Sequence, residues 1–78
     1  MSKQITFELS RDGDCIEIHS NPKGLIYLSD IFTKAASKGA DHTHLMTENF
    51  GGNELSTEKS GADNRLINYV KIFCWENE

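Results

Sequence analysis

The sequence predicts a small α+β domain, in which a mostly antiparallel sheet of four or five strands carries one helix on one face. Polar and apolar residues alternate over residues 4–10 and 15–19, and an Asp-Gly pair lies between these segments. Residues 22–38 have the apolar spacing of an amphipathic helix. Residues 65–75 are rich in β-branched and aromatic side chains, as strands are. We expect one domain over residues 1–78, in the order β-β-α-β-β-β.

The first two strands form the predicted hairpin. Asp12-Gly13 favours a tight type I′ turn, because both central residues of that turn need positive φ. The side chains expected to face the core are Ile5, Phe7, Leu9, Ile16 and Ile18. The side chains expected on the opposite face are Thr6, Glu8, Cys15, Glu17 and His19.

The helix has a clear start and stop. Asn21 can cap it, and Pro22 fits the first helical position, where a missing N–H costs nothing. Gly39 is a natural left-handed stop after residue 38. The predicted core stripe consists of Leu25, Leu28, Ile31, Phe32 and Ala35 or Ala36.

The second half of the chain should complete the sheet. A third strand is expected over roughly residues 41–47, a short extended piece over 54–58 and a last strand over 65–75. One helix covers one face of so small a sheet. The uncovered face would then carry Tyr69, Lys71, Phe73, Trp75 and the histidines of the third strand. Exposed aromatics are typical of a protein interface; alternatively, the tail or loops cover them, or the faces of the last strand are reversed.

Charge and composition restrict the function. Twelve acidic against eight basic residues give a formal charge of −4, which disfavours nucleic acid and anionic membrane as partners and favours a basic protein. No apolar run approaches the roughly 18 residues of a membrane span, and no signal-peptide core is present, so we expect a cytoplasmic protein. Cys15 and Cys74 are expected to be free, buried thiols.

Candidate chemistry is sparse. His42 and His44 would leave one strand face about 6.6 Å apart, a spacing that suits zinc, but a third ligand is missing. Cys15 and His19 would lie about 13 Å apart on one strand, too far to share a proton. We therefore expect no catalytic residues, no metal and no cofactor, and a histidine-based metal protein remains the alternative.

The segment with two glycines reads as a turn. A phosphate-binding glycine loop opens a helix, whereas Gly51-Gly52-Asn53 precedes no helical pattern and lies between Glu48 and Glu54. The loop instead presents the oxygen acceptors of Glu48, Asn49, Asn53 and Glu54, which suit a partner's Lys, Arg or N–H groups. Phe50 would anchor this loop in the core or contact the partner, and anchoring is favoured.

Three segments resemble the immunity protein 32 family of bacterial polymorphic-toxin systems: "DHTHLMTENFGGNELS" (41–56), "GDCIEIHSNPKGLIYL" (13–28) and "NRLINYVKIFCW" (64–75). Phe50 stands where Trp would be expected. The resemblance implies a small cytosolic antidote that binds a cognate toxin domain and blocks it, without chemistry of its own. It supplies no contact residues.

The residues themselves suggest the contacts. We expect Glu48, Asn49, Asn53 and Glu54 to act as acceptors, His42 and His44 as neighbours, and Tyr69 and Trp75 as aromatic anchors, while Gly51 and Gly52 set the loop conformation. A homodimer that buries the face with Tyr69, Phe73 and Trp75 is an alternative that is compatible with toxin binding.

Overall fold

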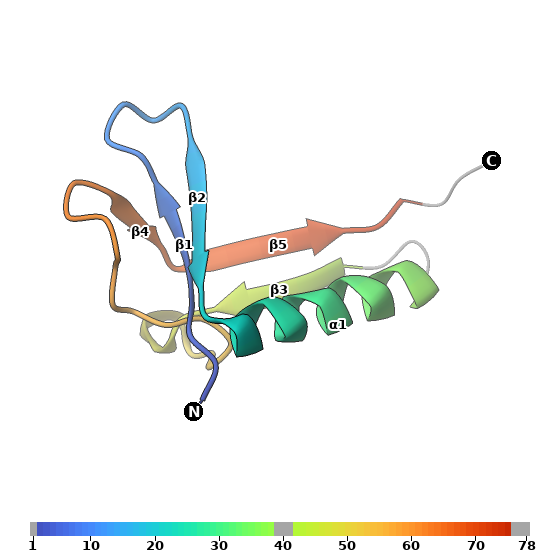
Figure 1. Cartoon of the computed structure of the whole chain (residues 1–78). Helices are drawn as coiled ribbons and strands as arrows, with labels where there is room; N and C mark the ends of the chain where they lie inside the picture. The colour runs from blue at the N-terminus through green and yellow to red at the C-terminus, as the bar shows by residue number, and fades with distance from the viewer. Residues whose placement is uncertain (1, 39–41, 76–78) are drawn as a thin grey trace.

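The computed structural model of the chain describes residues 2–38 and 42–75. Its elements are strands β1 (Ile5–Leu9) and β2 (Ile16–Ser20), helix α1 (Pro22–Lys38), strand β3 (His42–Met46), the 3₁₀ turn η1 (Glu48–Phe50), and strands β4 (Arg65–Ile67) and β5 (Tyr69–Phe73) (Figure 1). The predicted α+β class and element order are confirmed. The predicted helix stop, Gly39, and the predicted strand start, residue 41, lie outside the described residues. No described helix is long and apolar enough to cross a membrane.

The strands form two antiparallel sheets instead of the single predicted one. One has the order β2-β1-β4, and the other pairs β3 with β5. Figure 1 shows the three-stranded sheet standing across the two-stranded sheet. The predicted strand over residues 65–75 divides at Asn68, so that its halves enter different sheets.

The predicted strand over residues 54–58 is wrong. This segment links the two sheets, because the N–H of Leu55 donates to the carbonyl of Met46 (3.1 Å) and the next N–H, that of Ser56, donates to the carbonyl of Ile5 (2.7 Å). Leu55 is buried in the hydrophobic core. Because these two consecutive N–H groups bond to different sheets, the segment forms no continuous ladder of hydrogen bonds with either sheet.

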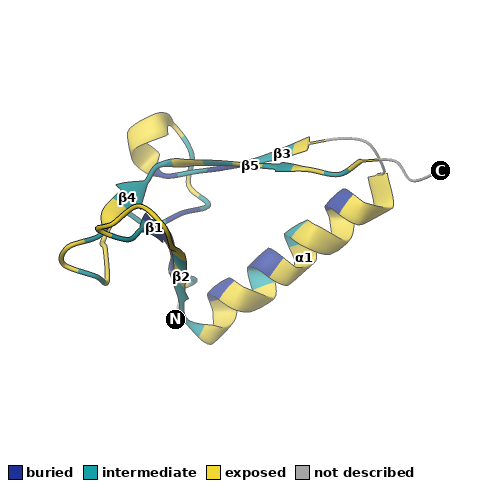
Figure 2. Ribbon diagram, turned by 90° about the horizontal axis from the view of Figure 1, so that it is seen from above, coloured by how far each residue is buried: buried dark blue, intermediate teal, exposed yellow. Residues whose placement is uncertain are grey.

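The core lies where α1 meets both sheets. It contains Ile5, Phe7, Leu28, Leu45 and Leu55, with Tyr27, Ile31, Ile67, Val70 and Ile72 packed around them. Helix α1 runs along one face of the β3-β5 sheet and turns its buried positions toward that sheet (Figure 2).

Several predicted core positions are instead exposed. Ile16 and Ile18 are 54% and 49% exposed, because the helix follows the β3-β5 sheet and meets β2 only where β2 leads into the helix. Leu25 and Phe32 are also exposed, because Gly24, Leu28 and Ala35 form the inward face. The apolar spacing located the helix correctly, but the inner face that it predicted is rotated about the helix axis from the observed one.

The hairpin turn also differs from the type I′ prediction. Gly13 has a φ of 79°, but no described non-glycine residue has a positive φ, so Asp12 does not adopt the conformation that type I′ needs. The loop closes through the Ser10 N–H, which donates to the Cys15 carbonyl at 2.8 Å. The cysteines are free, as predicted, but Cys15 is exposed and Cys74 only half-buried.

The start of the helix is held tightly against β1. The Asn21 carboxamide oxygen accepts the N–H groups of Gly24 (2.8 Å) and Gln4 (3.1 Å), which confirms the predicted cap. A Cβ on Gly24 would collide with the Ser20 hydroxyl and lie 2.7 Å from both the Gln4 carbonyl and Ile5 Cγ1. Gly24 therefore permits a close approach between helix and strand.

Gly24→Ala should destabilise the fold although alanine is the better helix former by about 1 kcal/mol. Overpacking costs about 1–3 kcal/mol, and we expect about 3 kcal/mol here because the new Cβ would lie 2.7 Å from a backbone carbonyl; the gain in helix propensity offsets about 1 kcal/mol of this cost. We expect a net loss of about 2 kcal/mol and a Tm lower by roughly 8–16 °C, measured by thermal denaturation. Lys23→Ala, at an exposed neighbouring position, should leave the Tm nearly unchanged. A Gly24→Ala protein as stable as the wild type would show that this contact is not tight.

Candidate partner-binding surface

The face of the β3-β5 sheet opposite α1 carries a group of side chains that are exposed, except for His44 and Met46, which are half-buried. In the register of the two strands, His42 lies opposite Phe73, His44 opposite Lys71, and Met46 opposite Tyr69. The core residues Leu45, Val70 and Ile72 alternate with these and point the other way, toward α1. We call the outward group, which consists of His42, His44, Met46, Phe50, Tyr69, Lys71, Phe73 and Trp75, the open sheet face.

The rings of the open sheet face touch one another in sequence. Centroid distances are 6.2 Å for Trp75–Phe73, 5.8 Å for Phe73–His42, 4.8 Å for His42–His44, 5.4 Å for His44–Tyr69 and 6.2 Å for Tyr69–Phe50. Trp75 is 81% exposed. Phe50 is 55% exposed, so its predicted anchoring in the core is wrong: it rests on Tyr69 instead. The result is a continuous, solvated aromatic strip.

The loop beside this strip is fixed through Asn68, the residue between β4 and β5. Its carboxamide oxygen accepts hydrogen bonds from the Thr47 hydroxyl (2.6 Å) and the Asn49 amide (3.2 Å), and its carbonyl accepts the Thr47 N–H (3.0 Å). Thr47 is fully buried. Asn68 therefore holds η1, with Glu48 and Phe50, next to the end of the strip.

The two glycines shape the same loop. Gly51 has a φ of 91°, a conformation that side chains rarely adopt, and ends η1. A Cβ on Gly52 would lie 2.6 Å from the Cβ of Met46. Glu54 turns back to accept the Met46 N–H at 3.0 Å, so this carboxylate also stabilises the loop, whereas Glu48, Asn49 and Asn53 are exposed.

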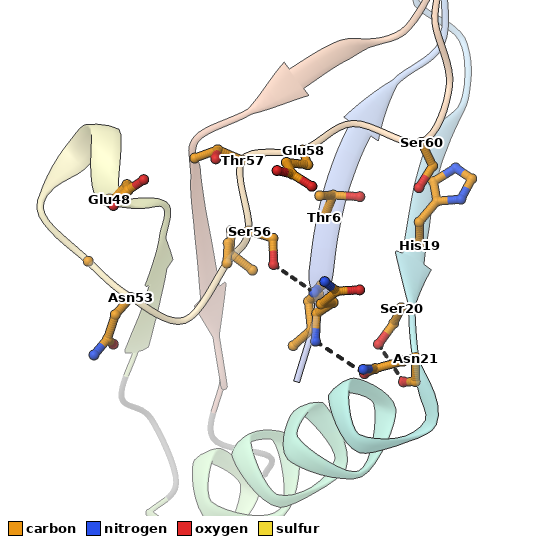
Figure 3. Close-up of a pocket in the computed structure, with 14 residues that line it drawn as sticks. Thr6, His19, Ser20, Asn21, Glu48, Asn53, Ser56, Thr57, Glu58 and Ser60 are labelled. Atoms are coloured by element: carbon orange, nitrogen blue, oxygen red, sulfur yellow. Dashed lines mark hydrogen bonds between the residues drawn. The ribbon is translucent and has the colours of Figure 1, made fainter. Parts of the chain in front are cut away.

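A polar hollow of about 720 Å³ opens beside the loop (Figure 3). It lies between the beginning of β1, the end of β2 and residues 52–60. Glu48 and Glu58 contribute negative charge, and no Lys or Arg belongs to its described lining. Two of its lining residues are joined by a hydrogen bond, in which the Ser56 hydroxyl oxygen accepts the Ile5 N–H at 3.3 Å. The hollow is suited to a cationic group and not to a phosphate.

The polar face of the hairpin, predicted to be uncovered, is covered in part by residues 58–64: Thr6 and Glu8 are buried, Glu17 and His19 are half-buried, and Cys15 is exposed. The Glu8 side chain is 0% exposed, and its carboxylate accepts hydrogen bonds from the Thr6 hydroxyl, the Asn64 amide (2.8 Å) and the N–H groups of Ser60 (2.9 Å) and Gly61 (3.1 Å). Burial raises the pKa of Glu8, but the hydrogen bonds outweigh it and lower the pKa from its ordinary 4.5 to about 2. This carboxylate fastens the loop to the sheet.

Glu8 also belongs to a group of possible metal ligands. Among residues 2–38 and 42–75, Glu8, Glu17 and His19 bring three such atoms within 4.8 Å of one another. Asn64 donates to both carboxylates, and His19 Nε2 lies 2.8 Å from Glu17 Oε1. These hydrogen bonds explain why the three side chains lie close together, so the cluster has a structural role and needs no metal ion. His42 and His44 acquire no third ligand in the described part of the chain.

Comparison with known families assigns the chain. The model of immunity protein 32 matches residues 16–70, which is more than half of the chain. The chain belongs to the immunity protein 32 family. No curated protein and no solved structure matches it. The immunity protein 32 match spans β2, α1, β3, the glycine loop, β4 and the beginning of β5, whereas Lys71, Phe73 and Trp75 of the open sheet face follow the matched segment.

The contacts predicted from sequence fall in two neighbouring places on this immunity protein 32 domain. Four lie on the open sheet face: His42, His44, Tyr69 and Trp75. The other four lie on the adjoining loop: Glu48, Asn49, Asn53 and Glu54. The sequence did not predict the exposure of Phe50 or the role of Asn68. The available signal for Asn68 was its polar amide side chain between two β-rich segments.

Proposed function

We propose that the chain is a non-enzymatic immunity protein that binds a cognate bacterial toxin and neutralises it by covering the toxin's functional surface. The observation that carries the proposal is the aromatic strip from Trp75 to Phe50, which is solvated although it is large enough to dominate an interface. Exposed Trp, Tyr and Phe side chains are the residue types that anchor protein complexes. Membership of the immunity protein 32 family supports the same function.

The adjoining loop supplies polar recognition in this proposal. Glu48, Asn49 and Asn53 face solvent as acceptors, and the hollow next to them is lined with hydroxyl and carboxylate oxygens. A Lys or Arg side chain of the toxin fits this region. The net charge of −4 would speed association with a basic toxin surface and disfavours nucleic acid as a direct partner.

Growth rescue tests the function. The toxin encoded beside this gene, expressed alone in a bacterial cytoplasm, should stop growth, and co-expression of this chain should restore it. The purified proteins should then form a complex that elutes as one species. If the pure proteins fail to associate and the chain gives no rescue, the proposal is wrong.

Two alternatives give different results in the same preparation. A second copy of the chain can bury the open sheet face, in which case light scattering would show a dimer that the toxin dissociates. A metal protein based on His42 and His44 would contain stoichiometric zinc that His44→Ala removes. We propose no metal and no cofactor, so elemental analysis of untagged protein should find neither zinc nor another bound metal in stoichiometric amount.

A further inference from the structure

We infer that the toxin places a carboxylate, from Asp or Glu, against Lys71 inside an otherwise apolar patch. The inference rests on the proposed function and specifies the chemistry of the partner surface. Its starting point is that Lys71 is a cation in the middle of the aromatic strip, in a chain whose net charge is negative.

The position of Lys71 places its ammonium among the rings. It lies between Tyr69 and Phe73 on the same face of β5, and its Nζ lies 5.8 Å from the Tyr69 centroid and 6.0 Å from the Phe73 centroid. His44 is its cross-strand neighbour. A partner that covers these rings must also cover the ammonium group.

Within residues 2–38 and 42–75, no carboxylate provides a counter-charge for Lys71. The described part of the chain contains no ion pair to Lys71, and the side chains around it on the open sheet face are aromatic rings, imidazoles and Met46. The His44 Nδ1 is engaged by the Tyr69 hydroxyl. Glu48 lies on η1, at the Phe50 end of the strip, and forms no ion pair with Lys71.

Desolvation decides what the partner must supply. Burying an ammonium without a counter-charge costs several kcal/mol, and cation–π contacts return only about 1–2 kcal/mol of this. A complementary carboxylate removes most of that cost and forms a charge-assisted hydrogen bond. The surface then has a positive site at Lys71 and a separate group of oxygen acceptors on the loop with Glu48, Asn49 and Asn53. Two sites of opposite polarity would fix the orientation of the toxin.

The test compares charge loss with charge reversal at Lys71. Lys71→Met keeps the apolar stem and should weaken toxin binding about 10- to 100-fold, and Lys71→Glu should weaken it by more than about 100-fold. Lys34→Met and Lys34→Glu are matched controls on the exposed side of α1 and should change the Kd by less than about twofold. Calorimetry with the purified toxin gives the Kd, and circular dichroism checks that each variant is folded.

The outcomes separate the inference from the function on which it rests. If Lys71→Met binds like the wild type while Phe73→Ala weakens binding, the open sheet face docks the toxin but no carboxylate meets Lys71, and the inference is overturned. If no wild-type complex forms, the function and the inference both fail. Restoration of Lys71→Glu binding by one Asp→Lys or Glu→Lys change in the toxin would identify the carboxylate directly.

Discussion

Phe73→Ala combined with Trp75→Ala should weaken the complex with the toxin by about 2–4 kcal/mol, roughly 30- to 1,000-fold in Kd. These two rings stack at 6.2 Å and expose 53% and 81% of their surface, so their removal takes away most of one end of the strip. Stability of the free protein should change by less than about 0.5 kcal/mol, because exposed side chains contribute little to folding. Isothermal calorimetry and thermal denaturation measure the two effects.

Phe32 provides the matched control for this variant. It is 48% exposed, close to the 53% of Phe73, but lies on α1 and away from the open sheet face. Phe32→Ala should leave the Kd within about twofold of the wild type. If Phe32→Ala and Phe73→Ala reduced the affinity for the toxin equally, the effect of an exposed aromatic residue would not depend on its position. That result would contradict a defined docking surface.

Glu8→Gln should destabilise the free protein by about 3 kcal/mol at neutral pH, the free energy that corresponds to a pKa lowered from 4.5 to about 2. The buried carboxylate accepts N–H groups from Ser60, Gly61 and Asn64, and glutamine would turn an N–H₂ group toward some of these donors. Urea denaturation measures the loss. Glu58→Gln, at an exposed position on the same loop, should have almost no effect.

The same carboxylate makes stability depend on pH in a defined direction. Because the pKa of Glu8 is lower in the folded state than in the unfolded state, its contribution is complete above about pH 4.5 and is lost as the pH falls toward 2. The wild type should therefore lose about 3 kcal/mol more than Glu8→Gln between pH 6 and pH 2. Parallel pH profiles for the two proteins would show that Glu8 is not the titrating anchor.

Local patterns in the sequence were sufficient for the class and for most element boundaries. Alternation located β1 and β2, and the Asn21-Pro22 pair located the start of α1, because caps and side-chain periods are set by neighbouring residues. The division into two sheets was not predictable in this way. It occurs at Asn68, whose partners Thr47 and Asn49 are 21 and 19 residues away along the chain.

The candidate surface was predicted in part for the same reason. Aromatic residues at alternate positions of the last strand indicated an uncovered face, and the structure brings Tyr69 and Trp75 onto one side with His42 and His44. Alternation also predicted that Thr6 and Glu8 would be exposed. Both are buried, because residues 58–64 fold back over the hairpin, and a period of two says nothing about a loop some 50 residues away.

The most direct test of the central claim is a hydrogen-exchange or NMR footprint of the chain in complex with its toxin. Docking on the open sheet face predicts protection or shift changes in β3, η1, β5 and Trp75, and little change on the solvent side of α1, where Ser29, Thr33 and Lys34 are exposed. A footprint confined to α1 and β2, with Tyr69, Phe73 and Trp75 unchanged, would contradict it.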